Sequence, residues 1–262
     1  MWKSKYGKKY LTADDEEFRR SAWEATWHKV RDHNLLADRG NKSFRLKMNH
    51  FADLTTQERN SRGCDYCGSC WAFATVGVIE SRYCIKYKKL LELSEQQLVD
   101  CDTRNTACCG GKPARAFEYI SAKGIMTSED YEYVEYPEKC SYTREESIQL
   151  NMSKYYLLPD ESNIAAAVAF DGPVTVGFAA VEDFMLFDGE GIYDGKCAKE
   201  ANHAIIIIGY GTEDDEDYWI IKNSWGTDWA DNGYAKVRRN SNQCEIAEEA
   251  ATADILGPYE EE

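Results

Sequence analysis

The order in which helical and strand-like patterns occur is the feature that most limits how this chain can fold. Before about residue 150 most apolar positions recur at helical spacing, whereas later runs rich in β-branched and aromatic residues alternate with glycine and acidic turns. The predicted helices cover 14–34, 69–88, 94–101 and 113–123, and the predicted strands cover 43–48, 173–178, 203–209, 218–222 and 234–238. Helices followed by strands predict an α+β fold with two lobes, a helical one over about 64–150 and a β-rich one over about 151–257.

Local signals support two of these helices. Ser94 to Gln97 forms a capping box, and Pro113 lies in the first turn of its helix. The helix over 14–34 is amphipathic and carries acid-before-base pairs four residues apart. On this pattern alone, an ordinary packed helical subdomain and a regulatory segment are both open.

The chain contains no candidate for a membrane-spanning segment. No apolar run approaches the roughly 18–20 residues that a bilayer requires, and the longest aliphatic stretch, 204–208, has the length of a buried strand. The basic start is not followed by an apolar segment, so it is not a secretory signal. Ten cysteines nevertheless favour an oxidising compartment, as do glycosylation patterns at Asn41 and Asn151, so we expect the numbering to begin after a removed leader.

Charge is distributed unevenly along the chain. The net charge of −15 argues against nucleic acid or an anionic membrane as a partner. Residues 1–58 hold 12 Lys and Arg against 9 Asp and Glu, a net of +3, so the remaining residues carry −18. A basic segment therefore precedes an acidic body, and the two signs favour their association. Acid would protonate the carboxylates, so we expect this association to be tighter near neutral pH than near about pH 4.

Three residues together suggest nucleophilic catalysis. Cys70 follows a glycine-serine turn at the start of an apolar helix, where the helix dipole favours thiolate over thiol. His203 stands at the entry of the most aliphatic strand, and Asn223 stands where a strand breaks into a turn beside Trp225. Separately each has a structural explanation, as a disulfide or core cysteine or as a satisfied polar residue. Together they supply a nucleophile, a base and an amide that orients the base, with an indole to keep water off that hydrogen bond.

Several segments extend this reading to a known family. They occur in order over roughly residues 64–257 and read CGSCWAF, LSEQQLVDC, CCGG, NHAIIIIGYG and YWIIKNSWGTDWADNGY. These segments resemble the signature segments of the papain family. Residues 14–58 resemble that family's inhibitory propeptide of the cathepsin L type, through Glu16, Arg20, Trp23, Val30, Asn34, Asn49, Phe51 and Asp53. Thr26 and Lys47 depart from it, because the family usually has asparagine and glycine there.

The resemblance implies a papain-like fold with a helical left lobe and a β-barrel-like right lobe. It implies a truncated propeptide over 1–58 and a peptidase domain over 59–262. The implied activity is that of a cysteine-type endopeptidase zymogen, in which a Cys70 thiolate and a His203 imidazolium hydrolyse peptide bonds without a cofactor or metal. The implied partners are peptide or protein substrates and the chain's own propeptide as inhibitor. A monomer in a lysosome or vacuole, or secreted, is expected.

The resemblance also implies a disulfide pattern. The family's three bridges correspond to Cys67–Cys108, Cys101–Cys140 and Cys197–Cys244. We expect a fourth, Cys64–Cys109, with Cys84 left as a core thiol. The spacing Cys64-x2-Cys67-x2-Cys70 also allows an iron–sulfur site, but the position of the usual fourth ligand is Ala74.

Four residues are expected to contact substrate. Gly110 and Gly111 correspond to a glycine pair that borders the cleft, where glycine permits close approach of a peptide backbone; a plain turn is the alternative. Trp225 is placed beside the catalytic histidine. Glu249 corresponds to the base of the pocket for the second residue before the scissile bond. A carboxylate there, as in cathepsin B-like enzymes, should admit arginine, although a solvated charge is equally open.

Two departures concern activity. The family's oxyanion-binding glutamine is missing, because the corresponding position is Cys64 or, with a longer loop, Ser61; losing such a donor typically costs about 10²–10³ in turnover. Only 16 residues separate Asp53 from Cys70, a reach of at most ~55 Å, so the segment that normally contains the activation cut is missing. A catalytically weakened homologue that acts as a binding or inhibitory protein is therefore the alternative.

Overall fold

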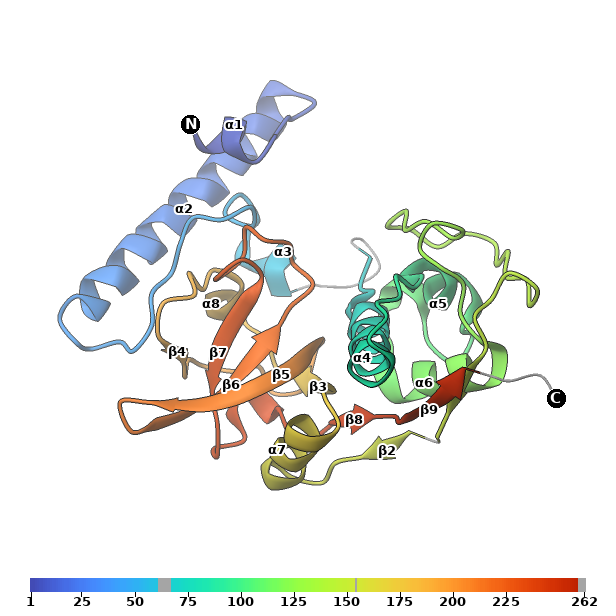
Figure 1. Ribbon diagram of the computed structural model, residues 1–262. Coiled ribbons are helices and arrows are strands. Elements are labelled where there is room, and N and C mark those ends of the chain that lie inside the picture. The colour runs from blue at the N-terminus through green and yellow to red at the C-terminus, as the bar shows by residue number, and fades with distance from the viewer. Residues whose placement is uncertain (61–66, 154, 259–262) are drawn as a thin grey trace.

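The computed structural model describes residues 1–60, 67–153 and 155–258. Two lobes lie side by side, and the N-terminal segment packs along the outer side of the β-rich lobe (Figure 1). The N-terminal segment contains α1 (Trp2–Lys5), α2 (Ala13–Ala37) and α3 (Thr56–Asn60). No described helix combines the length and apolar character needed to cross a membrane.

The helical lobe contains the three helices that the sequence predicts and one short 3-10 turn that it does not predict. They are α4 (Cys70–Tyr87), α5 (Glu95–Cys101), the 3-10 turn η1 (Ala107–Cys109) and α6 (Pro113–Lys123). Ser94 caps α5 by accepting a hydrogen bond from the Gln97 amide at 2.9 Å. The second half of the predicted capping box does not form. The buried Gln97 side chain instead points into the lobe, where it donates to the Tyr119 hydroxyl and to the Gly124 carbonyl.

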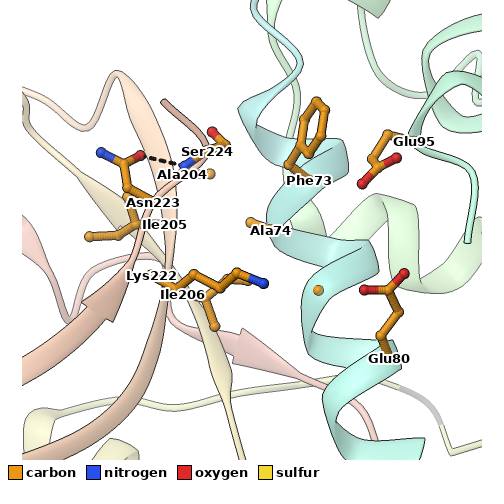
Figure 2. A pocket seen from close by; sticks show the side chains of 11 residues that line it. Phe73, Ala74, Glu80, Glu95, Ala204, Ile205, Ile206, Lys222, Asn223 and Ser224 are labelled. Carbon is orange, nitrogen blue, oxygen red and sulfur yellow. Dashed lines mark hydrogen bonds between the residues drawn. The ribbon is translucent and has the colours of Figure 1, made fainter. Parts of the chain in front are cut away.

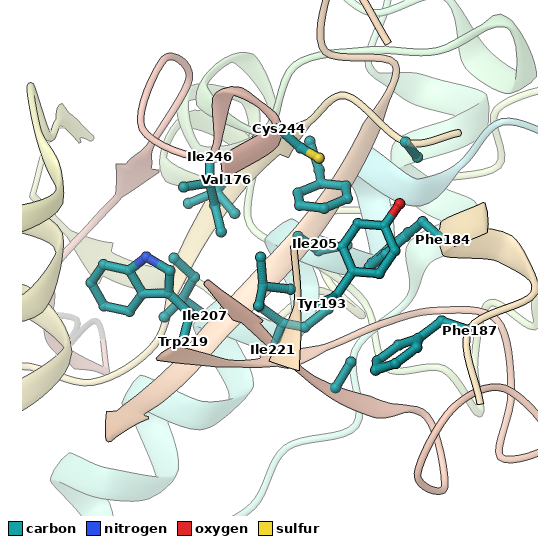
Figure 3. Packing of buried hydrophobic residues seen from close by; sticks show 14 of the residues in the cluster. Val176, Phe184, Phe187, Tyr193, Ile205, Ile207, Trp219, Ile221, Cys244 and Ile246 are labelled. Carbon is teal, nitrogen blue, oxygen red and sulfur yellow. The ribbon is translucent and has the colours of Figure 1, made fainter. Parts of the chain in front are cut away.

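The β-rich lobe contains a seven-stranded sheet in the order β2-β8-β3-β5-β6-β7-β4. Its strands are β2 (Tyr156–Leu157), β3 (Val174–Phe178), β4 (Ile192–Tyr193), β5 (His203–Glu213), β6 (Glu216–Lys222), β7 (Tyr234–Arg238) and β8 (Ala251–Thr252). The sheet is accompanied by α7 (Glu161–Phe170), α8 (Glu182–Met185) and η2 (Gln243–Glu245). In the pairings of the described residues the sheet stays open, with β2 and β4 at its edges. Aromatic and aliphatic side chains fill the core beneath it (Figure 3).

Strand β5 belongs to both hydrophobic cores. Its side chains alternate between the two faces, so Ala204 and Ile206 pack in the helical lobe while Ile205 and Ile207 pack in the β-rich lobe. This explains why the run is aliphatic at every position. A Cβ on Gly77 of α4 would lie 2.6 Å from Cδ1 of Ile206, so the glycine lets the helix approach the strand closely.

Within residues 67–258 the chain crosses between the lobes twice, and the two crossings run together. Strand β1 (Leu150–Met152) pairs with β9 (Ile255–Pro258) beside the helical lobe, whereas β2 and β8 pair in the large sheet. Between them the Ser153 amide donates to the Asp254 carbonyl, and the Asp254 amide donates to the Ser153 hydroxyl, both at 2.9 Å. Lys86, near the end of α4, donates to the Ile255 carbonyl at 2.6 Å. The paired crossing therefore lies at the opposite end of α4 from Cys70.

The N-terminal segment shares a core with the β-rich lobe. Val30, Phe44 and Leu46 are buried in the same hydrophobic cluster as β3 and β5. The strand predicted over 43–48 is wrong, because the segment makes only an isolated bridge, between Leu46 and Phe187. The amide side chain of Asn34 instead holds both the N–H and the carbonyl of Leu46 at 2.9 Å. The alternating apolar residues of the 43–48 segment therefore pack against the β-rich lobe and do not form a strand of a sheet.

We expect Gly77→Leu to lower the free energy of unfolding by about 1–3 kcal/mol, because the new side chain overpacks the contact between α4 and β5. Urea denaturation measures the change. Ala166→Leu, at an exposed position of α7, is the control and should stay within about 0.5 kcal/mol. Adding Ile206→Ala to Gly77→Leu should recover part of the loss. An unchanged midpoint for Gly77→Leu would contradict the close contact.

Candidate active site

Residues from three parts of the chain border one cleft of about 1030 Å³ between the lobes. The helical lobe contributes Cys70, Gly110 and Gly111, and the β-rich lobe contributes His203, Trp225 and Glu249. The N-terminal segment closes one side of the cleft with Lys8, His50, Phe51, Leu54 and Glu58. Six residues predicted from sequence thus meet at one cavity although they lie up to 179 positions apart.

Cys70 is the first residue of α4 and carries a half-buried thiol. The preceding residue, Ser69, does not cap the helix with its side chain, because its hydroxyl pairs with the Tyr133 hydroxyl at 2.5 Å. The N-terminal end of an 18-residue helix therefore acts on the sulfur, and its dipole stabilises the thiolate. Tyr133 was not anticipated from the sequence, because no motif marks it.

His203 is oriented by two neighbours. It is 5% exposed at the start of β5, and its Nε2 lies 2.8 Å from Oδ1 of Asn223. With Asn223 accepting this hydrogen bond, Nε2 carries the proton and Nδ1 is the ring nitrogen left for proton transfer. The ring of Trp225 stacks on the imidazole at 4.5 Å and 25°. Asn223 itself is fixed, because its Oδ1 also accepts the Ser224 amide at 2.8 Å.

Gly110 and Gly111 both border the cleft, but a side chain is disfavoured at each for a different physical reason. Gly110 has φ of 107°, and a Cβ there would meet nothing within 4 Å, so it leaves an open edge of backbone. A Cβ on Gly111 would lie 2.7 Å from Trp71 and Asn105, so that glycine is required for packing. Close approach of an extended ligand backbone is therefore possible at Gly110.

Disulfides brace both sides of the cleft. The described residues contain Cys67–Cys108, Cys101–Cys140 and Cys197–Cys244, the three pairs implied by the resemblance. The first of them ties the start of α4 to the loop that carries Gly110. The expected Cys64–Cys109 bridge and the oxyanion candidates Ser61 and Cys64 involve residues outside the described part of the chain. Cys84 keeps its thiol and is half-buried on α4.

A second, smaller pocket of about 80 Å³ lies behind Asn223, between the lobes. Glu80 and Glu95 line it from the helical lobe, and Lys222 extends toward them from β6 (Figure 2). Burial, reinforced by the charge of Glu80 and opposed by Lys222, raises the pKa of Glu95 to about 7. Burial also raises the pKa of Glu80, although its carboxylate accepts the Leu93 amide at 2.8 Å. No sequence motif pointed to this group.

Comparisons with known proteins agree on one family. Residues 50–253 match the model of the papain family cysteine proteases, and residues 1–58 match the cathepsin propeptide inhibitor domain. Cathepsin S of Bos taurus is 36% identical over 295 residues, which cover 94% of this chain and 89% of that protein. Pro-cathepsin H of Medicago truncatula is 40% identical over 243 residues, which cover 85% and 68%.

Solved structures share the fold. A digestive procathepsin L 3 from the larval midgut of Tenebrio molitor superposes with a TM-score of 0.90 at 30% identity, over 97% of both chains. A recombinant stem bromelain precursor superposes with a TM-score of 0.86 at 28% identity, over 98% of this chain and 97% of that one. The two-lobed architecture with an attached N-terminal segment is thus the architecture of these precursors.

Glu95→Gln tests the buried carboxyl behind Asn223. A raised pKa in the folded protein means that the fold holds a proton between about pH 4.5 and 7 that the unfolded chain releases, so this group's contribution to stability falls as pH rises through that window. Glutamine is neutral throughout. We therefore compare the free energy of unfolding of Glu95→Gln with that of wild type at each pH. This difference should favour the variant by about 1–2 kcal/mol more at about pH 8 than at about pH 5, a range that allows for the solvent that reaches this side chain.

Urea midpoints at both pH values measure this difference. Glu129→Gln, at an exposed glutamate of the same lobe, should show no pH-dependent difference from wild type. The same relative stability of Glu95→Gln at both pH values would contradict the raised pKa.

Proposed function

Because the chain belongs to the papain family of cysteine proteases and carries that family's cathepsin-type propeptide, we propose that Cys70, His203 and Asn223 perform its peptide hydrolysis. The observation that supports this most strongly is the 2.8 Å contact between His203 and Asn223 at a cleft that Cys70 also borders. In this proposal residues 1–58 are the propeptide and residues 59–262 are the peptidase domain.

The proposed reaction has two steps. The Cys70 thiolate attacks the carbonyl carbon of the scissile bond, and a backbone N–H at the start of α4 stabilises the oxyanion. The His203 imidazolium then donates its proton to the leaving amine, which departs and leaves a thioester. His203 next takes a proton from water, whose oxygen attacks the thioester, releasing the carboxylic acid and restoring Cys70. Asn223 keeps the imidazole ring in position, and Trp225 shields their hydrogen bond.

Substrate binding is proposed along the same cleft. The backbone of Gly110 is open on the cleft side and suits an extended peptide, whereas Gly111 supports the turn. Glu249 borders the cleft from the β-rich lobe, where it would meet the second residue before the scissile bond. A lysosomal, vacuolar or secreted location is proposed on the evidence of the three disulfides.

In the zymogen the propeptide is bound to the peptidase domain, and the contacts between the two combine ion pairs with apolar packing. Lys29 of α2 lies 2.8 Å from Glu182 and 2.6 Å from Asp183 on α8, and Arg59, the residue of α3 that directly follows the propeptide, pairs with the same Glu182. The Arg59 side chain is 1% exposed, so this pair is desolvated. Phe51 packs edge-on against Trp225 at 5.5 Å. The basic segment is thus held on acidic groups, as the charge distribution predicts.

Acid is proposed to release this segment. His50 of the propeptide borders the cleft, and burial, together with the charge of Lys8, lowers its pKa. A lowered pKa in the docked state means that stability is lost as pH falls and the imidazole takes up a proton.

Asn223→Ala and Cys70→Ala test the catalytic assignment. We expect Cys70→Ala to abolish both hydrolysis of a fluorogenic peptide and labelling by an epoxide inhibitor. Asn223→Ala loses a hydrogen bond to a charged ring, worth about 1.5–3 kcal/mol, so kcat/KM should fall about 10- to 100-fold. Asn41→Ala, at an exposed position, should be unchanged. An acid-treated wild type that neither hydrolyses nor is labelled would favour the weakened-homologue alternative.

Glu182→Gln tests how latency is maintained. Leaving a buried arginine without its counter-charge costs about 3–5 kcal/mol, so we expect the rate of Cys70 labelling at neutral pH to rise at least about tenfold. Glu190→Gln is a matched control, because Glu190 faces Arg45 of the propeptide at 3.9 Å but is 76% exposed, and such pairs contribute little. Equal labelling rates for both variants would contradict the assigned role of Glu182.

A further inference from the structure

An ion pair joins the two lobes at the edge of the cleft. Nζ of Lys112 lies 2.6 Å from Oε1 of Glu249, and the two side chains are 55% and 43% exposed. Lys112 precedes α6 in the helical lobe, next to Gly110 and Gly111, whereas Glu249 precedes β8 in the β-rich lobe. The residues are 137 positions apart, so the pairing exists only because the lobes face each other.

Both partners are held in place by their surroundings. The Lys112 N–H donates to Oδ1 of Asn105 at 2.8 Å, and the Asn105 amide group donates to the Lys112 carbonyl at 3.4 Å. Asn105 is 6% exposed, so it fixes the backbone from which the lysine extends. On the other lobe, a Cβ built on Gly177 would lie 3.2 Å from the Glu249 Cβ and 3.1 Å from the Ala201 Cβ. The stem of Glu249 is therefore packed against the wall of the cleft.

The part of the cleft around Glu249 suits a substrate side chain more than a substrate backbone. Gly111 and Pro113 line the cleft from one lobe, and Gly177, Ala201 and Glu249 line it from the other. Gly177 and Ala201 are small residues on the β-rich side, and the only charged group among the five is Glu249. The carboxylate was expected to attract arginine at the second residue before the scissile bond, but it already has a cationic partner.

We propose that Lys112 determines the specificity of this pocket, an inference that rests on the proposed function. Paired with Lys112, Glu249 presents no net charge, so the pocket favours uncharged apolar side chains. A substrate arginine can pair with Glu249 only by displacing Lys112. The lost ion pair with Lys112 cancels most of the interaction energy that a bidentate guanidinium would provide. Removing Lys112 exposes the anionic pocket, and removing Glu249 exposes a cationic one.

The test measures binding, so it does not depend on catalysis. Full-length Cys70→Ala/Glu182→Gln protein, in which the weakened propeptide contact should leave the cleft accessible at neutral pH, is titrated by calorimetry with acetyl-Ala-Arg-Gly-amide, acetyl-Ala-Phe-Gly-amide and acetyl-Ala-Glu-Gly-amide. Lys112→Met should raise the Arg-to-Phe affinity ratio about two- to fivefold, the range expected from an exposed ion pair. Adding Glu249→Gln should cancel that rise. Glu249→Gln alone should raise the Glu-to-Phe ratio by a similar factor.

Lys123→Met, at the other end of α6 and exposed, is the matched control and should leave every ratio unchanged. An Arg-to-Phe ratio that Lys112→Met does not change overturns the proposal. Failure of all three peptides to bind in the Glu182→Gln background, when Cys70 of Glu182→Gln is readily labelled and the cleft is therefore open, overturns it too, because the ion pair would then border no peptide pocket.

The proposed function is judged separately, from hydrolysis by the chain that retains Cys70. A chain that hydrolyses peptides but keeps its affinity ratios in Lys112→Met refutes only the role of Lys112. A chain that changes its ratios as expected but hydrolyses nothing refutes only the catalytic assignment.

Discussion

The packing of α4 against β5 sets the distance between the lobes, and the candidate site depends on that distance. Cys70 begins the helix and His203 begins the strand, so the contact that Gly77 permits with Ile206 places both starts at the same cleft. Because β5 contributes alternate residues to the two cores, neither lobe can shift along the strand without disturbing its own packing. Two unrelated side chains are thereby held at one cavity by aliphatic contacts some distance from the chemistry.

The same dependence explains what the sequence could reveal. The order of helices and strands, the helix over 113–123 and the three pairs of cysteines were accessible because they rest on local periodicity or on a family pattern. The ion pair of Glu249 with Lys112 and the shared pocket of Glu95 and Lys222 were not, because these residues come near one another only after the lobes come together. The prediction of a strand over 43–48 was wrong for a related reason. Its alternating apolar residues are buried against a lobe far along the chain, and the alternation alone does not distinguish such burial from a strand.

The N-terminal segment is part of a core and not merely a cover on one. Phe44 and Leu46 are 2% and 1% exposed among side chains of the β-rich lobe. Releasing such residues exposes apolar surface, which costs roughly 25 cal/mol per Å², so loss of a single ion pair would not suffice to detach the segment. Latency in this molecule therefore combines a charge-sensitive contact near the cleft with an apolar anchor farther away. Only the first of these responds directly to pH.

The paired crossing at Ser153 and Asp254 has a mechanical consequence. Within residues 67–258 it is where the backbone passes from one lobe to the other, and each of the three described disulfides lies within a lobe. It lies near the end of α4, remote from the helix start (Figure 1). Because α4 and β5 pack closely, any rotation of one lobe against the other would be small and would turn about this far end. The displacement grows with distance from the pivot, so it would be greatest at the mouth of the cleft, where a substrate enters.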